Sequence, residues 1–594
     1  MNRKFNKIWI LVAGCFAIFM TFDVLWSLGT TFRGMSNPAL YVNAIFASFL
    51  LTLPYLLFRR VWIQGVVMFL LDILLEANLM YCRTYFTAIP ADSYFLAGNL
   101  KDFTASVWDS MRWGDIALPL VTIVALWLAF RTPINKQAKP IAGTYVLLTV
   151  GAGAVSWLLS LTGGGYKSQI STMEESCYYS TCVVPVYTVF GNLIYQGSQS
   201  NSATLTDDDV AEIEGWIGEK DRLRPYTSLP DSIPGRKNLV VILCESLESW
   251  VIQRDVNGAP ITPYLNSLIA DSTTLYAPHV LTQVAAGRSI DCQLLLNAGM
   301  LPMMQSVYSM KYPHSTYRTL TKAMKERDND SRAYILTCDK PIVWNQEVIG
   351  KAFGIDTLLH RSSWHNDELV GNPAKLSDGS FLRQSVEKLK NGEIWKEGEP
   401  AFVQWVTYSG HNPFVLPDKL KDPEFSVPAN WHEKAANYVT MAHYTDESLK
   451  PLIEYLKSRS DYDSTLIVIT GDHEGLAANR GELLEDEDMK GVIDENQFTP
   501  LIILNSPVAG RYDDVMGQVD MYPTLLNLMG LDDYEWKGMG QSIFEPGKPA
   551  YAIPSMTNYI TGDTTGVAKD VMDNIADARK ISDKIIAKDY FGNK

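Results

Sequence analysis

Residues 238–246 read NLVVILCES, and this stretch decides the fold of the larger part of the chain. The apolar run from Leu239 to Leu243 is typical of a strand that is buried on both faces of a parallel sheet. Glu245 and Ser246 follow at the carboxyl end of the strand, where open α/β sheets bind their ligands. An acid in this position can also be an ordinary helix cap, so the stretch alone leaves two interpretations open.

Three later stretches have the same strand character: residues 333–336, 402–407 and 465–470. Helical patterns alternate with them, which predicts an α/β domain with a central, largely parallel sheet. The polar residues that follow these strands include Asp339, Trp344, His411, Asp472 and His473. Because the carboxyl ends of parallel strands meet at one edge, we expect these side chains to converge with Glu245 on one crevice.

Metal binding is the chemistry that this set favours. Glu245, Asp472 and His473 offer two carboxylates and an imidazole, a mixed oxygen and nitrogen set that suits one divalent cation. Manganese is the first expectation, with zinc and magnesium as alternatives. Each residue alone has an ordinary interpretation, as a helix cap or a loop histidine, but their joint placement at strand ends favours the metal site.

A candidate nucleophile lies in the stretch AAGRSID, residues 285–291, just before a helical run at 292–296. Ser289 would be a helix N-cap by default. Backbone amides at a helix N-terminus also face an anion, which suits a phosphoryl group. A serine hydroxyl becomes a good nucleophile when a base or a metal lowers its pKa, and the expected cation would do so.

The first 165 residues have a different character. Five apolar segments have roughly the length of about 20 residues that spans a bilayer: 8–28, 39–58, 61–81, 115–131 and 143–162. A cleaved signal peptide fits the first segment poorly, because its apolar run is long and further spans follow at once. Lys and Arg residues flank alternate loops, which predicts that these loops are cytoplasmic and that everything after residue 165 lies on the other side.

Three carboxylates, Asp23, Asp72 and Glu76, lie toward the outer ends of these spans. Acids inside a membrane are costly and favour a functional role, here the seating of a lipid headgroup. The alternative is that some of them reach the membrane interface. Cys177 and Cys182 lie close together after the last span, where a disulfide and two unpaired thiols are equally compatible with their spacing.

Four regions follow from these patterns: a five-span membrane domain at 1–165, an extracytoplasmic linker with short helices at 166–236, a catalytic domain at 237–560 and a polar, helical tail at 561–594. The net charge of −15 argues against nucleic acid as a partner, because proteins that follow phosphate backbones carry basic faces. A small or lipid-borne target is expected instead, and the sequence gives no prediction of an oligomeric state.

Six motifs occur in the order seen in lipoteichoic acid synthases: NLVVILCES at 238–246, GRSID at 287–291, WN at 344–345, SGHNPF at 409–414, GDH at 471–473 and GQVDMYPTL at 517–525. Five spans followed by such a domain are also the architecture of that family, which is part of the alkaline phosphatase and sulfatase superfamily. The chain therefore resembles a lipoteichoic acid synthase over most of its length.

The resemblance implies one metal ion bound by Glu245, Ser289, Asp472 and His473. It makes Ser289 the residue of a covalent phospho-intermediate, at a position where the synthases usually have threonine. It also assigns substrate contacts to Asp339, Trp344, Gln346 and His411. His411 would hydrogen-bond a phosphate oxygen or protonate the leaving group. The implied partners, at the cell membrane, are a phospholipid donor and an extracytoplasmic glycan or lipid acceptor.

Two residues depart from the family pattern. Gln346 stands where the synthases have an arginine, and Thr337 stands where a histidine is common. Glutamine cannot reproduce the two-pronged grip of arginine on phosphate. We therefore expect weak handling of glycerol phosphate unless Lys340 or another nearby cation substitutes, and acceptance of a different headgroup, with ethanolamine phosphate as the first candidate. A phosphoethanolamine transferase is accordingly the alternative function.

Two further functions compete with a transferase. A sulfatase shares the fold, but its formylglycine arises in a Cys/Ser-x-Pro-x-Arg pattern, which residues 289–293 (SIDCQ) lack. A phosphodiesterase or hydrolase of the same fold stays open. A binding protein on an inactive version of the fold would ordinarily lack a metal-binding residue, whereas all four are present here, so catalysis is expected.

Overall fold

The computed structural model describes most of the chain: residues 7–29, 38–85, 111–132, 139–162, 204–285, 287–303, 307–341, 343–371, 374–476, 480–555 and 559–593. The chain divides near Leu205 into two compact units. Cys177 and Cys182 lie outside the described residues. Their disulfide therefore stays a prediction.

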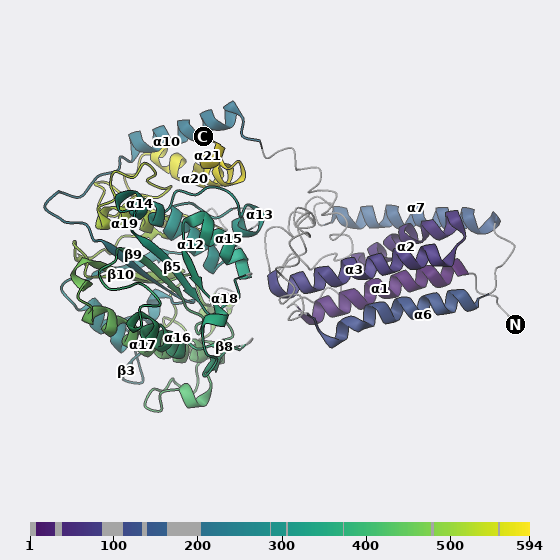
Figure 1. Ribbon diagram of the computed structural model, residues 1–594, viewed down its shortest axis with the longest axis horizontal. Helices are drawn as coiled ribbons and strands as arrows, with labels where there is room; N and C mark the ends of the chain where they lie inside the picture. The colour runs from purple at the N-terminus through teal and green to yellow at the C-terminus, as the bar shows by residue number, and fades with distance from the viewer. Residues whose placement is uncertain are drawn as a thin grey trace. The chain divides into compact units, whose positions relative to one another are not determined.

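Five long apolar helices form the first unit (Figure 1). They are α1 (Lys7–Gly29), α2 (Pro38–Phe58), α3 (Val61–Tyr85), α6 (Ala117–Arg131) and α7 (Lys139–Leu161). Helix α1 packs against α2, α3 and α6, whereas α7 packs against α2. The five predicted spans are confirmed as helices that are long and apolar enough to cross a membrane, which indicates a multi-pass membrane protein.

Two carboxylates are buried among these helices. Asp23 in α1 and Asp72 in α3 are 1% and 3% exposed, and neither has a hydrogen-bond partner among the described residues. Glu76, one turn beyond Asp72, is half-buried. Because unpaired acids are costly in apolar surroundings, a role for these three residues in seating a lipid headgroup stays a prediction.

One mixed sheet organises the second unit, with the strand order β12-β4-β11-β10-β1-β9-β5-β6 and with β13 paired to β4. Its strands are β1 (Asn238–Cys244), β4 (Leu275–Leu281), β5 (Arg332–Thr337), β6 (Thr357–Leu359), β9 (Ala401–Val406), β10 (Thr465–Gly471), β11 (Phe498–Leu504), β12 (Gly510–Arg511) and β13 (Met516–Gly517). Strands β10, β1, β9, β5 and β6 run parallel to one another, whereas β11 is antiparallel to β10 and β4. The predicted α/β fold and its four strands are confirmed.

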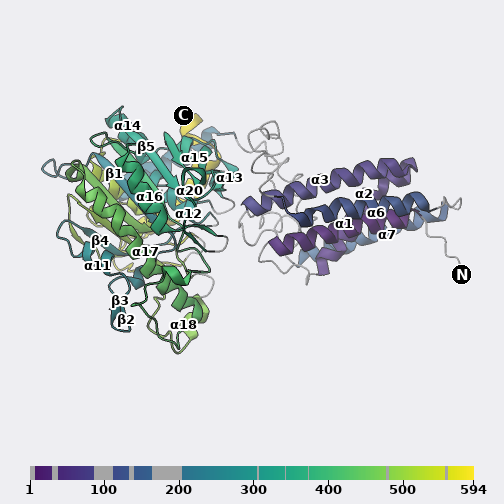
Figure 2. The same ribbon diagram turned by 60° about the horizontal axis from the view of Figure 1, so that its bottom comes forward.

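Helices cover both faces of this sheet, as Figures 1 and 2 show. One face carries α11 (Pro263–Ile269), α16 (Asp378–Lys390) and α17 (Glu433–Ser458). The other face carries α12 (Ser289–Ala298), α14 (Leu320–Arg327), α15 (Gln346–Phe353) and α19 (Met521–Met529). Every residue of β1, β9 and β10 is buried between these layers, which explains why these strands are continuous apolar runs.

The smaller elements lie around this core. They are the helices α13 (Tyr308–Lys311), α18 (Arg480–Glu485) and α21 (Tyr590–Asn593), and the two-stranded sheets β2–β3 (Asp255–Val256, Ala259–Pro260), β7–β8 (Leu369–Val370, Lys375–Leu376) and β14–β15 (Tyr551–Ala552, Thr561–Gly562).

Two helices from distant parts of the sequence pack together at one side of the second unit. They are α10 (Asp207–Leu223) and α20 (Lys569–Ala587). Trp216 Nε1 donates a hydrogen bond of 3.0 Å to the carbonyl oxygen of Asn574, and Lys584 forms an ion pair of 3.0 Å with Asp209. Parts of the predicted linker (166–236) and of the predicted tail (561–594) thus pack against each other within this unit.

Candidate active site

The register of two neighbouring strands brings the first two acids to the same level. Cys244 of β1 is paired with Gly471 of β10, so Glu245 and Asp472 both follow at the carboxyl edge of the sheet. Glycines make the close approach of the loops possible at this edge. A Cβ atom on Gly410 would lie 2.0 Å from the carbonyl oxygen of Glu245, and one on Gly471 would lie 1.9 Å from that of Leu247.

Glu245, Asp472 and His473 form a buried cluster whose possible ligand atoms all lie within 4.8 Å of one another. His473 Nε2 lies 3.4 Å from Glu245 Oε1 and 3.6 Å from Asp472 Oδ2. The exposed fractions of the three residues are 7%, 0% and 6%. A buried carboxylate pair with an imidazole could hold a metal ion.

Ser289 joins this cluster from the start of α12. Its Oγ lies 3.4 Å from Glu245 Oε2 and 3.5 Å from His473 Nε2. Arg288 just before it has φ 53° and ψ −116°, a backbone conformation that is costly for a non-glycine residue and frequent at functional sites. Asp291 holds the turn, because its Oδ2 accepts hydrogen bonds of 2.9 Å from the backbone N–H groups of Ala285 and Gly287.

The spacing of these side chains leaves room for one cation. The four distances above lie between 3.4 and 3.6 Å, with Glu245 Oε1 facing His473 and Oε2 facing Ser289. Asp472 Oδ1 accepts hydrogen bonds from the backbone N–H groups of Ser246 and His473, but the buried Oδ2 has no partner among the described residues. A cation bound to that carboxylate oxygen would supply the partner that it lacks.

The orientation of His473 also suits metal binding. Its Nδ1 lies 3.0 Å from the carbonyl oxygen of Glu474 and 3.0 Å from Arg288 Nη2. Arg288 Nη2 donates to the same carbonyl oxygen at 2.8 Å, and Arg288 also pairs with the Glu474 carboxylate. These contacts hold the ring so that Nε2 faces Glu245 at 3.4 Å and Asp472 at 3.6 Å, which is the side on which a metal ion would lie.

Burial, together with the nearby charge of Asp472, raises the pKa of Glu245 to about 7. Both causes disfavour a second negative charge in this cluster. A divalent cation would act in the opposite direction and hold both carboxylates ionised.

A second group of residues lines the same sheet edge after β9 and β5. The ring of His411 stacks on Tyr408 with 5.1 Å between ring centroids, and Lys375 Nζ lies 4.2 Å above the Tyr408 ring. Lys375 also forms an ion pair with Asp339. Burial, together with the charge of Lys375, lowers the pKa of His411, which favours its neutral form at neutral pH.

Gln346 is buried and hydrogen-bonded to other side chains of the protein. It is 7% exposed, and its amide exchanges two hydrogen bonds of 3.0 Å with the amide of Gln293 on α12. Gln404 of β9 also donates to Gln293. Thr337 is used in a similar way, because its Oγ1 accepts from the backbone N–H of Asp339. Trp344 is half-buried in the turn before α15.

Lys375 and the Arg288–Glu474 pair are missing from the sequence predictions. Lys375 lies in the two-residue strand β8, which has no sequence pattern that distinguishes it from a surface lysine. Arg288 and Glu474 are neighbours of predicted residues, so their adjacency to Ser289 and His473 was an available signal.

Two family models match the chain, one after the other. The model described as "Lipoteichoic acid synthase N-terminal domain" matches residues 1–174, and the model described as "Sulfatase" matches residues 237–531. The chain belongs to the lipoteichoic acid synthase family. It is therefore an enzyme of the lipoteichoic acid synthase type within the sulfatase superfamily.

Relatives within this family match at nearly full length. The lipoteichoic acid synthase of Staphylococcus saprophyticus is 24% identical over 570 residues, which cover 94% of this chain and 86% of the relative. The Staphylococcus aureus synthase is 24% identical over 564 residues, with coverages of 92% and 84%. The crystal structure of the lipoteichoic acid synthase LtaP from Listeria monocytogenes has a TM-score of 0.51 at 18% identity and covers 64% of this chain and 98% of that one, which supports the fold.

The metal site can be tested on the full-length protein in detergent. At 100 times its Kd, manganese would stabilise the parent protein by about 2.7 kcal/mol and raise its Tm by about 5 °C. Loss of a side chain that only hydrogen-bonds a metal ligand already costs about 10–100-fold in metal affinity. Asp472→Asn changes a proposed ligand itself, so it should weaken manganese binding by more than about 100-fold and abolish the rise in Tm. Metal content and thermal unfolding measure this.

Asp463→Asn is the matched control, because Asp463 is an exposed acid just before β10. It should bind manganese like the parent protein. Full metal content in Asp472→Asn would contradict the site.

Proposed function

We propose that this family member transfers glycerol phosphate, or a related phosphate-linked headgroup, from a membrane phospholipid to an extracytoplasmic glycan or lipid acceptor. The reaction proceeds through a covalent intermediate on Ser289. The observation that carries the proposal is the position of Ser289 Oγ, 3.4 Å from Glu245 and 3.5 Å from His473 at a helix N-terminus. The names of the relatives and the five apolar helices support it.

One divalent cation would be bound by Glu245, Ser289, Asp472 and His473. Manganese is the first expectation, and zinc or magnesium are the alternatives. Such a cation lowers the pKa of a bound hydroxyl and neutralises charge on phosphate oxygens.

The chain's own residues perform two displacements. In the first, Ser289 Oγ forms a bond to the donor phosphorus, the bond from phosphorus to the diacylglycerol oxygen breaks, and the serine proton ends on that oxygen. In the second, an acceptor hydroxyl attacks the phosphorus, the bond to Ser289 breaks, and the acceptor's proton returns to Ser289.

His411 is the candidate proton carrier. Its Nδ1 lies 2.7 Å from the carbonyl oxygen of Asn412, so the proton belongs on Nδ1 and Nε2 is free to accept one. The lowered pKa keeps this acceptor available at neutral pH.

The catalytic proposal predicts a graded loss with two variants. Ser289→Ala should reduce turnover by at least about 1,000-fold, as expected for loss of a nucleophile. Ser289→Thr should retain measurable turnover, because it keeps a hydroxyl for activation. Release of labelled headgroup from a phospholipid donor measures both, with the Tm of each variant as the check on folding. Turnover by Ser289→Ala at the parent rate would exclude the mechanism.

Headgroup choice depends on how the donor's negative charge is held. Gln346 lacks charge, and its amide is paired with Gln293. Lys375 Nζ lies over the ring of Tyr408, and the other neighbour of that ring is His411. Lys375 therefore places a positive charge near His411, and its ion pair with Asp339 holds it there. We assign to Lys375 the role that the missing arginine has in the relatives. Its positive charge would also repel the ammonium group of ethanolamine phosphate, which favours glycerol phosphate as the transferred group.

This assignment predicts that phosphatidylglycerol is a better donor than phosphatidylethanolamine. A hydrogen bond to a charged group contributes about 1.5–3 kcal/mol, so Lys375→Gln should raise the KM for phosphatidylglycerol by about tenfold or more, with a smaller change in kcat. Lys351→Gln is the control, because Lys351 is exposed and pairs only within α15 among described residues. A parent preference for phosphatidylethanolamine, or an unchanged KM in Lys375→Gln, would contradict the assignment.

A further inference from the structure

Another buried carboxylate lies in the loop after β1. Glu248 is 0% exposed, and its two oxygens accept four hydrogen bonds. Oε1 accepts from the backbone N–H groups of Gly475 and Leu476 at 2.8 and 3.0 Å. Oε2 accepts from Trp250 Nε1 at 2.9 Å and from Arg480 Nη2. Four donors on one buried carboxylate fix the positions of the groups around it.

These hydrogen bonds join the two loops that carry the metal-site residues. Glu248 lies in the loop after β1, which begins with Glu245, whereas Gly475 follows His473 in the loop after β10. A shift of one loop relative to the other would break the bonds to Glu248. This side chain therefore couples the position of Glu245 to that of His473, although the proposed reaction itself does not use it.

Tyr438 of α17 joins the same two loops. It is 3% exposed, and its hydroxyl accepts from the backbone N–H of Glu248 at 2.9 Å and donates to the carbonyl oxygen of Ser246 at 2.8 Å. Its ring also packs closely on Gly475, where a Cβ atom would lie 2.6 Å from Tyr438 Cε2. Any larger residue in place of this glycine would push the two loops apart.

The ring of Tyr438 also reaches a third loop. Phe414 packs edge-on against it, with 5.1 Å between the ring centroids. Phe414 lies three residues beyond His411 in the loop after β9. Glu248 and Tyr438, here called the loop clamp, thus contact all three loops that carry the candidate metal-site and proton-carrying residues.

We propose that the loop clamp positions these three loops and thereby sets the affinity of the site for a divalent cation. Functional side chains must be held within about 0.5 Å of their productive geometry, and the clamp holds the backbone on which Glu245 and His473 stand. Neither Glu248 nor Tyr438 contacts the cation or the substrate, so both are positioning residues. The inference rests on the metal site of the proposed function and adds the residues that maintain its geometry.

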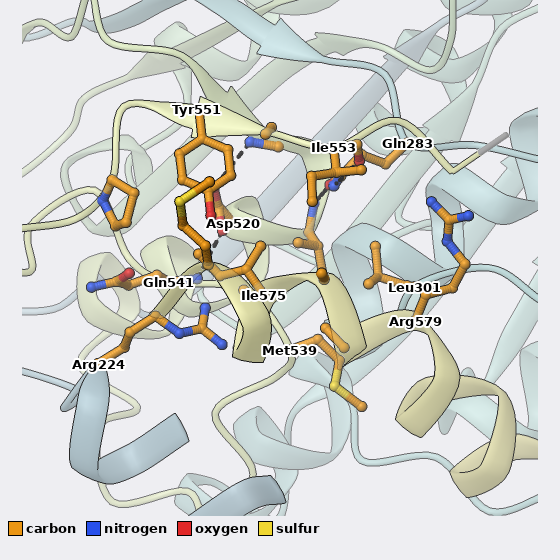
Figure 3. A pocket seen from close by; sticks show the side chains of 18 of the residues that line it. Arg224, Gln283, Leu301, Asp520, Met539, Gln541, Tyr551, Ile553, Ile575 and Arg579 are labelled. Carbon is orange, nitrogen blue, oxygen red and sulfur yellow. Dashed lines mark hydrogen bonds between the residues drawn. The ribbon is translucent and has the colours of Figure 1, made fainter. Parts of the chain in front are cut away.

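The loop clamp is separate from the cavity of about 580 Å³ that lies between α10, β14 and α20 (Figure 3). Neither Glu248 nor Tyr438 lines that cavity. Substitutions in the clamp therefore leave its walls unchanged, and a change in metal affinity would come from the loops at the sheet edge.

Manganese binding to the full-length protein in detergent tests the role of Glu248. Glu248→Gln replaces one acceptor oxygen by an amide nitrogen, which cannot accept, so two of the four donors lose their partner. We expect the Kd for manganese to rise by about tenfold or more. The signal of free manganese in electron paramagnetic resonance measures this Kd without any turnover.

Asp446→Asn is the matched control for this substitution. Asp446 is also 0% exposed, and it accepts two backbone N–H hydrogen bonds, from Tyr264 and Leu265 of α11 rather than from a loop at the site. It should lower the Tm of the metal-free protein as Glu248→Gln does, but it should leave the Kd for manganese unchanged. A loss of stability alone therefore does not imitate the expected result.

Tyr438→Phe keeps the test decisive if Glu248→Gln does not fold. It retains the ring that packs on Gly475 and Phe414 and removes only the hydroxyl, so the Kd for manganese should rise several-fold with a small change in Tm. Tyr264→Phe is the control, because the Tyr264 hydroxyl donates to Glu454 at 2.7 Å, and it should leave the Kd unchanged.

The outcomes separate the loop clamp from the proposed reaction. Manganese binding by the parent protein with the same Kd in Glu248→Gln and Tyr438→Phe would overturn the clamp alone. An equal rise in Kd in the two control variants would also overturn it, because the effect would then follow from lost stability. Turnover by Ser289→Ala at the parent rate would contradict the proposed reaction and leave the effect of the clamp on metal affinity standing.

Discussion

The structure depends on one electrostatic constraint: two carboxylates, Glu245 and Asp472, are buried beside each other at the edge of a sheet. Like charges in an apolar environment repel and are poorly solvated, so such a pair requires a positive charge between or beside its members. The parallel register of β1 and β10 produces this pair. Gly410 and Gly471 allow the adjoining loops to close over it, and the strained turn before α12 brings a hydroxyl to it.

The positively charged side chains at this edge of the sheet are each held by an acidic side chain. Arg288 is held by Glu474 and fixes the carbonyl oxygen that orients His473, while Lys375 is held by Asp339 beside Tyr408 and His411. Each cation is thus positioned by its own acid before substrate arrives, which reduces the reorganisation that a phosphoryl transfer requires. Five helices of the same chain are long and apolar enough to cross a membrane, so the proposed phospholipid donor would lie in the bilayer that these helices span.

The sequence predicts the parts of this arrangement that depend on local pattern. Apolar runs locate β1, β5, β9 and β10 and the five long helices, and polar residues at strand ends mark Glu245, Asp472 and His473. It does not reveal contacts between distant segments. The pairing of Gln346 with Gln293, the approach of Lys375 to Tyr408 and the packing of α10 on α20 each join residues that are far apart in the sequence.

In the proposed mechanism, Ser289 carries the transferred group between donor and acceptor. Mass spectrometry of the full-length protein, quenched after incubation with phosphatidylglycerol in the absence of acceptor, tests it most directly. A glycerol phosphate adduct is expected on the peptide that contains Ser289, and no adduct is expected on that peptide in Ser289→Ala. An adduct on another residue, or headgroup release at the parent rate without any adduct on Ser289, would contradict it.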